Sequence, residues 1–141
     1  MDLVYAPADI LKKPTISVDD DMDNVVKLAE QMHTLMVQNH GIGLAAPQVG
    51  VDKSFFIIGD KTRYKLAVNP KIIETSEEKV LMTEGCLSFP GIFLKVLRPL
   101  NVVVEYVNNK GETINEKLDG MMSRVFQHEA DHLNGITFDT L

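Results

Sequence analysis

The chain contains two histidines and a glutamate with the spacing of a metal site on a helix. His128 and His132 are four residues apart, so on an α-helix they share one face and can bind one ion. Glu129 lies beside them and can reach a metal-bound water. The alternative is a surface helix with solvated histidines, but Met121 and Val125 extend the same stripe with apolar side chains. The pattern therefore predicts a metal centre that faces inward.

A catalytic metal site needs a third protein ligand, and Cys86 is the candidate. It is the only cysteine of the chain and follows an expected strand, within Glu84-Gly85-Cys86-Leu87-Ser88. A free cysteine is most often a small buried hydrophobic residue, and for this residue alone that alternative stays open. Because a lone cysteine forms no intramolecular disulfide, we expect a free thiolate and a reducing, cytoplasmic setting.

A third segment, residues 41–50, is rich in small residues and carries no charge. Its sequence is Gly-Ile-Gly-Leu-Ala-Ala-Pro-Gln-Val-Gly. This composition indicates a backbone that another group approaches closely, and Gln48 adds an amide that both donates and accepts hydrogen bonds. A helix C-cap followed by a tightly packed turn would have the same composition, so the segment by itself leaves both interpretations open.

Two helices are expected to position these residues. Aspartates at 19–21 supply capping and N-terminal charge for a helix whose apolar residues recur every three to four positions, and Gly41 would end it as a C′ glycine. The second helix is expected over about residues 120–133 and carries the histidines. Asp119 would cap it, and Asn134 and Gly135 would close it.

Between the helices the pattern changes to strands and turns. Strands are expected at 54–59, 65–69, 71–75, 78–83, 94–97, 101–107 and 112–118. The last two would form a hairpin, and residues 1–18 would lie across the surface. We therefore expect a single α+β domain over residues 1–141, with antiparallel strands packed around a central C-terminal helix and one further helix near the N-terminus.

Composition excludes several function classes. The chain has 141 residues, with 14 basic and 20 acidic side chains and a net charge of -6, so direct binding to nucleic acid is not expected. No apolar run approaches the roughly 20 residues of a membrane span, and the first residues lack the pattern of a signal peptide. A non-membrane protein of one domain is expected.

Taken together, three segments resemble, in order, the signature motifs of the peptide deformylases: Gly-Ile-Gly-Leu-Ala-Ala-Pro-Gln, Glu-Gly-Cys-Leu-Ser and Gln-His-Glu-Ala-Asp-His. The resemblance implies a metal-dependent hydrolase that removes the formyl group from N-formylmethionyl peptides of nascent proteins, giving formate and a free N-terminal methionine. It implies that Cys86, His128 and His132 bind one divalent ion, usually Fe²⁺, for which Zn²⁺, Ni²⁺ or Co²⁺ can substitute.

The resemblance also implies catalytic roles. Glu129 would act as general base and then as general acid. The side-chain amide of Gln48 and the backbone N–H of Leu87 would stabilise the oxyanion. Glu84 and Asp131 are acids beside metal ligands, and Arg98 is their expected common partner, although a solvated acid and a surface ion pair are the alternative.

Six residues are expected to bind substrate: Ile42, Gly43, Phe89, Gly91, Arg124 and Val125. Ile42, Val125 and residues near Phe89 would hold the methionine side chain, and the segments around Gly43 and Gly91 would pair with the peptide backbone as an added strand. Arg124 stands where an apolar residue is more common in the family, so it would point to solvent or alter the pocket rim.

The resemblance leaves alternatives and one departure. After Gly135 only six residues remain, whereas many family members continue into a C-terminal helix, so contacts with the ribosome would be weakened. A monomer is expected. The nearest competing enzyme is a metallopeptidase of the His-Glu-x-x-His class, which gives no reason for Cys86 or Gln48. A binding module without turnover is the alternative from another class, and the intact Glu129 argues against it.

Overall fold

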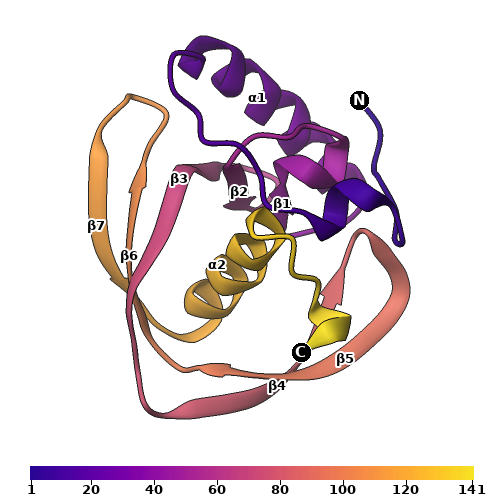
Figure 1. The fold of residues 1–141 in the computed structure, drawn as a ribbon, viewed down its shortest axis with the longest axis vertical. Helices are drawn as coiled ribbons and strands as arrows, with labels where there is room; N and C mark the ends of the chain where they lie inside the picture. Colours follow the sequence, from indigo (N-terminus) through magenta and orange to yellow (C-terminus); the bar gives the residue numbers. More distant parts are fainter.

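The helix that carries both histidines lies at the centre of the molecule, and the strands surround it (Figure 1). The computed structural model describes all 141 residues. The elements are α1 (Met22–Gln38), β1 (Gly43–Ala45), β2 (Phe55–Gly59), β3 (Tyr64–Thr75), β4 (Lys79–Cys86), β5 (Phe89–Pro99), β6 (Val102–Val107), β7 (Thr113–Leu118) and α2 (Gly120–Leu133). One antiparallel sheet has the order β1-β2-β3-β6-β7, and β4 pairs with β5 in a second sheet. The expected α+β architecture is confirmed.

Strand β2 is buried on both faces, which explains its unbroken apolar sequence. Alternate side chains of a strand point to opposite faces. Phe56 therefore packs in the cluster that α2 covers, where its ring meets the ring of Phe126 edge to face at 4.9 Å. Phe55 and Ile57 pack in the cluster that α1 covers. The strand thus joins the two helices into one core and fixes where α2 lies.

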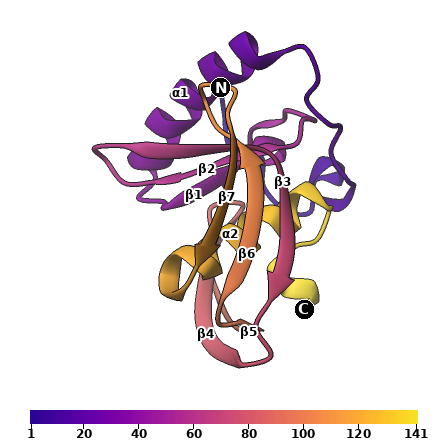
Figure 2. The same ribbon diagram turned by 90° about the vertical axis from the view of Figure 1, so that its left-hand side faces the viewer.

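The strands are longer than the apolar runs indicate. The two strands expected at 65–69 and 71–75 form the single strand β3, which passes through Pro70 with shifts in its pairing to β6. Strands β4 and β5 extend as far as Cys86 and from Phe89 onward, because they pair with each other over almost their whole length. The expected hairpin of β6 and β7 is confirmed, and Figure 2 shows these two strands beside β3 with the β4–β5 hairpin at one end.

Helix α1 ends differently from the expectation. His40, with a φ of 59°, takes the left-handed position that was assigned to Gly41. The N–H groups of His40 and Gly41 donate to the carbonyls of Val37 and Met36, which closes the helix in a Schellman pattern. Gly41 is needed for another reason, since a Cβ there would lie 2.7 Å from Cδ1 of Leu87. Helix α2 does close at Gly135, with a φ of 73°, as expected.

The expected side-chain caps of the two helices are wrong. Asp21 and Asp119 stand at the N-cap positions, but neither carboxylate accepts a hydrogen bond from a backbone N–H of its helix. The carboxylate of Asp21 instead forms an ion pair with Lys53. Neither α-helix is long and apolar enough to span a membrane.

The N-terminal segment is an integral part of the fold, and it touches two of the motifs. The N–H of Val4 donates to the carbonyl of Gln48 at 2.7 Å, and the N–H of Ala6 donates to the carbonyl of Ser88 at 2.9 Å. Further along, Leu11 is fully buried. The segment lies across the surface as expected, and it also ties together two loops that are 40 residues apart in sequence.

Candidate active site

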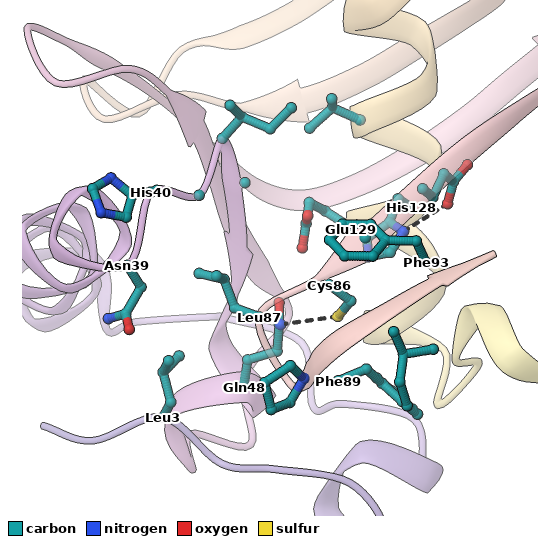
Figure 3. Close-up of a pocket in the computed structure, with 18 of the residues that line it drawn as sticks. Leu3, Asn39, His40, Gln48, Cys86, Leu87, Phe89, Phe93, His128 and Glu129 are labelled. Atoms are coloured by element: carbon teal, nitrogen blue, oxygen red, sulfur yellow. Dashed lines mark hydrogen bonds and ion pairs between the residues drawn. The ribbon is translucent and has the colours of Figure 1, made fainter.

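Three side chains from two elements converge beside the central helix. Cys86 ends β4, whereas His128 and His132 lie on successive turns of α2. Their ligand atoms all lie within 4.8 Å of one another, and Sγ of Cys86 is 3.3 Å from Nε2 of His132. A tetrahedral ion bound at about 2.0–2.3 Å would hold such atoms about 3.5 Å apart. One thiolate and two imidazoles in this arrangement therefore fit a divalent metal ion. Figure 3 shows two of these residues, Cys86 and His128, with Glu129 nearby.

Burial and hydrogen bonding set the states of the two histidines. Nδ1 of His128 donates to Oε1 of Glu84 at 2.8 Å, so its Nε2 is directed away from Glu84. Burial lowers the pKa of His128, but its hydrogen bonds with Cys86 and Glu84 raise it to about 10, so this ring carries a positive charge, and a bound metal ion would take the place of its Nε2 proton. Burial and the nearby charges of His128 and Arg98 lower the pKa of His132 to about 3, so this imidazole is neutral. Nδ1 of His132 and Oε1 of Glu129 are buried atoms without a hydrogen-bond partner, and a polar group bound in this site would lie close to both residues.

Glu84 is the hub of a buried ionic network. Its carboxylate accepts hydrogen bonds from Arg98 at 2.5 and 3.0 Å and from His128. Burial would raise the pKa of Glu84, but the hydrogen bonds and positive charges of His128 and Arg98 lower it to about 2. Arg98 also donates to Asp131 at 2.8 Å, so the expected common partner of both acids is confirmed. The ion pairs of Arg98 are buried rather than solvated, since Arg98 is 5% exposed.

Arg124 belongs to the same network, which corrects the expectation that it points to solvent. The residue is 6% exposed, and its Nη1 donates to Oε2 of Glu84 at 2.6 Å. The guanidinium also donates to the carbonyls of Val96 at 3.0 Å and Val80 at 2.6 Å. Arg124 therefore joins α2 to both strands of the β4–β5 hairpin. No local pattern indicates this role, because the partners are 28 to 44 residues away in the sequence.

Glu129 lies beside the candidate metal ligands and is almost completely buried. The residue is 4% exposed and lies beside Gly43, where a Cβ would be 2.5 Å from its Oε2. Burial raises the pKa of Glu129 to about 7; the positive charge of His128 lowers it and the negative charge of Glu84 raises it. A carboxyl group with a pKa near neutrality can both accept and return a proton.

The side-chain amide of Gln48 reaches the site from a third element of the fold, outside β4 and α2. Its residue is in the short 3-10 helix Ala46–Val49 and is 1% exposed. Oε1 accepts a hydrogen bond from the N–H of Ala45 at 2.9 Å, and Nε2 donates to Oγ of Ser88 at 3.1 Å. Nε2 also lies 3.5 Å from Sγ of Cys86. An amide N–H group is therefore held beside the metal ligands, as Figure 3 shows.

These groups open into a cavity of about 550 Å³. All six residues expected to bind substrate line it: Ile42, Gly43, Phe89, Gly91, Arg124 and Val125. The cavity also reaches Leu3, His40 and Phe93, which sequence reasoning missed. Leu3 and His40 lie outside the interpreted motifs, and Phe93 reaches the cavity through the pairing of β5 with β4. Met121 was expected to face inward, but it is 55% exposed and stands at the edge of the cavity.

Comparison with known proteins agrees with this geometry. The family model described as polypeptide deformylase matches residues 1–140. The peptide deformylase of Borreliella burgdorferi is 38% identical over 140 residues, which cover 98% of this chain and 85% of that protein. The protein of that name from Thermotoga maritima is 42% identical over 127 residues, covering 90% of this chain and 77% of the relative.

Solved structures show the same similarity. The crystal structure of peptide deformylase from Thermotoga maritima superposes with a TM-score of 0.95 at 38% identity, covering 99% of this chain and 95% of that one. A probable peptide deformylase from synechococcus phage S-SSM7 also superposes with a TM-score of 0.95, at 41% identity, covering 99% and 97% of the two chains. Because the family model matches residues 1–140 and relatives of that name are 38% and 42% identical over most of their length, this chain belongs to the polypeptide deformylase family.

Proposed function

We propose that this site removes the N-formyl group from N-formylmethionyl peptides and that six residues carry the reaction. Family membership supports the hydrolase activity on nascent peptides and its dependence on a divalent metal. The observation that carries the assignment of residues is the convergence of Cys86 with His128 and His132 beside the buried Glu129. The remaining two residues are Gln48 and Leu87.

The three ligands and Glu129 divide the work between them. A divalent ion held by Cys86, His128 and His132 would supply Lewis acidity to the attacking water and to the formyl oxygen. Glu129 takes the proton from the attacking water and returns it to the amine nitrogen that leaves with the peptide. A pKa of about 7 suits this residue for both transfers near neutral pH.

Gln48 and Leu87 stabilise the charge that develops on the formyl oxygen. The Gln48 amide is already oriented by Ala45 and Ser88, so its N–H group needs no rearrangement when the charge appears. Leu87 follows Cys86 directly, so its backbone N–H lies next to the metal ligand. Its side chain packs against Gly41 and thereby fixes the position of that backbone. Loss of one such donor typically costs about 3 kcal/mol in the barrier.

The cavity is suited to an extended peptide that begins with methionine. Val125 and Phe89 are buried, whereas Ile42 is exposed at the edge, so the three offer an apolar lining for a flexible thioether side chain. Strand β1 pairs only with β2, so its other edge is free at Gly43. A substrate backbone would add there as a further strand, with the segment around Gly91 on its other side.

We propose Fe²⁺ as the native metal, as the resemblance implies. The donor set suits Fe²⁺, Zn²⁺, Ni²⁺ and Co²⁺ alike, so the metal must be identified chemically. Metal analysis of protein purified without oxygen is expected to give one iron per chain. One zinc per chain, with full activity, would contradict the proposal.

We further propose that residues 1–141 act as one domain, as a monomer and in the cytoplasm. The two main clusters of buried residues support the single domain, because both contain side chains of β2. The net charge of -6 favours a peptide partner over direct contact with nucleic acid. Light scattering of the purified protein should give a mass of about 16 kDa, and twice that mass would contradict the monomer.

The direct test is release of formate from formyl-Met-Ala-Ser by the Fe²⁺-loaded or Ni²⁺-loaded protein. Wild-type protein should release formate, and Glu129→Ala should release almost none while still binding the metal. N-acetyl-Met-Ala-Ser is the control substrate, because a metallopeptidase would cleave internal bonds of both peptides. Loaded wild-type protein without formate release would overturn the assignment.

A further inference from the structure

Ser88, the last residue of the second motif, takes no part in the chemistry above, yet it is 1% exposed and makes two hydrogen bonds. Its hydroxyl donates to the carbonyl of Val4 at 2.7 Å and accepts from Nε2 of Gln48 at 3.1 Å. We propose that Ser88 is a positioning residue that fixes the orientation of the Gln48 amide. The proposal rests on the oxyanion-stabilising role proposed for Gln48.

The direction of each hydrogen bond follows from the main chain. A carbonyl oxygen only accepts, so the hydroxyl proton of Ser88 is committed to Val4. The Ser88 oxygen then offers only lone pairs, and these require the NH₂ end of the Gln48 amide. At the other end, the N–H of Ala45 only donates, so it requires the oxygen of the amide at 2.9 Å. The contacts with Ala45 and with Ser88 therefore each require the same orientation of the Gln48 amide.

A flipped amide would lose both contacts. It would set two lone-pair oxygens against each other at Ser88 and two N–H groups against each other at Ala45. Gln48 is 1% exposed, so water does not replace the lost hydrogen bonds. Because Nε2 carries two protons, one binds Ser88 and the other is available toward Sγ of Cys86, 3.5 Å away. That second proton is the one that would meet the oxyanion.

Ser88 reinforces the contact from Ala45, because the terminal torsion of glutamine has no strong preference of its own. That torsion is broad and roughly two-fold, so packing alone separates the two amide orientations weakly. Val4 adds rigidity, since its N–H also donates to the main-chain carbonyl of Gln48 at 2.7 Å. The same residue of the N-terminal segment thus holds the backbone of Gln48 and the hydroxyl that orients its side chain.

The test is a double-mutant cycle with the Ni²⁺-loaded enzyme. Loss of a whole oxyanion donor costs on the order of 100-fold in kcat. Ser88→Ala removes one of the two contacts that orient the amide, so it should lower kcat about tenfold with KM unchanged. In a Gln48→Ala background the same substitution should cause no further loss, because nothing remains to be oriented. The metal content and the absorption spectrum of the Co²⁺ form should stay as in the wild type.

A matched pair guards against a simple folding defect. Ser88→Thr keeps the hydroxyl, whereas Ser88→Val has nearly the same shape without it. The Thr variant should therefore have a higher kcat than the Val variant. Equal losses of kcat for Ser88→Ala in both backgrounds, or equal kcat for the Thr and Val variants, would overturn the proposal. A fully active Gln48→Ala enzyme would refute both this inference and the role proposed for Gln48, whereas formate release by wild type keeps the proposed function intact.

Discussion

Gly43 provides the sharpest test of where Glu129 must lie. A Cβ at this position would be 2.5 Å from Oε2 and 3.0 Å from Cδ of Glu129, and 3.0 Å from Cγ1 of Val125. Ordinary van der Waals contact begins near 3.4 Å, so the carboxylate must retreat by about 1 Å in Gly43→Ala. Glu129 is 4% exposed and enclosed, so this shift moves it away from the reacting atoms.

A displacement of about 1 Å at a catalytic group typically costs about 100-fold in rate, and we expect Gly43→Ala to lose that much kcat. The backbone of Gly43 is compatible with alanine, because it lies in an extended strand, so any fall in Tm should come only from the crowding of Glu129 and Val125. The assay measures kcat and KM for formyl-Met-Ala-Ser with the Ni²⁺-loaded enzyme, together with Tm from thermal unfolding.

Gly59→Ala is the matched control in the neighbouring strand. Its Cβ would collide with main-chain atoms, namely the carbonyl of Arg63 and, at 2.6 Å, Cα of Tyr64. A backbone clash cannot be relieved by turning a side chain, so this variant should lose Tm while its folded fraction keeps the wild-type kcat. The two variants should therefore show opposite patterns.

Two results would refute the reasoning. If kcat of Gly43→Ala were within about twofold of the wild type, the position of the Glu129 carboxylate would not be critical for the rate. This would contradict the rate loss expected when a catalytic group is displaced by about 1 Å. A rise in KM with unchanged kcat would show instead that the methyl group obstructs the peptide and leaves Glu129 in place.

Three further predictions follow from the buried charges. Burial raises the pKa of Glu129 to about 7, and the carboxylate is the form that accepts a proton, so kcat/KM should rise with pH toward neutrality. A bound cation moves the midpoint of this rise to lower pH. A kcat/KM that falls with rising pH over this range would contradict the role of Glu129 as a base. Arg124→Met removes one donor from Glu84 and the hydrogen bonds to two main-chain carbonyls, so the free energy of unfolding should fall by about 3 kcal/mol in denaturant titrations. Lys95→Met, which removes an exposed cation of β5, should change it by less than about 0.5 kcal/mol. The pKa of Glu84 is lowered from 4.5 to about 2 in the folded protein, so its contribution to stability is present above about pH 4.5 and is lost as the pH falls toward about 2. Acid unfolding of the wild type should therefore include a proton uptake over this pH range that Glu84→Gln lacks.

Local patterns predicted the two helices and the β6–β7 hairpin, but not strand β1 or the pairing order of the five-stranded sheet. The apolar and histidine stripe of α2 depends only on residues three to four apart, so the bounds of α2 and the shared face of its histidines follow from sequence. The β6–β7 hairpin also follows, because its turn is short and its two strands are adjacent. The end of α1 did not follow, since the reason for Gly41 is the side chain of Leu87, which belongs to another motif.

Long-range contacts could not be predicted in the same way. Arg124 looks like an ordinary charged residue on a helix, and only the packing of α2 against the β4–β5 hairpin turns it toward Glu84. Ser88 reads as a polar residue after a strand, and only the N-terminal segment gives its hydroxyl the partner that orients Gln48. In each case the partner is 40 or more residues away, and no periodicity of the sequence reports such a distance.

The residue types that are available for the chemistry follow from the amino-acid sequence alone. One thiol, two histidines on a helical face, a glutamate beside them and a glutamine in a small-residue segment define a metal-dependent hydrolase of this family. Their protonation and orientation depend on the folded chain, because charge and hydrogen bonding change with burial and with neighbours from other elements. Burial raises the pKa of Glu129 toward neutrality, and Glu84 presents one nitrogen of His128 to a metal. These properties arise only when the sheets close around α2, since water would otherwise solvate each group separately.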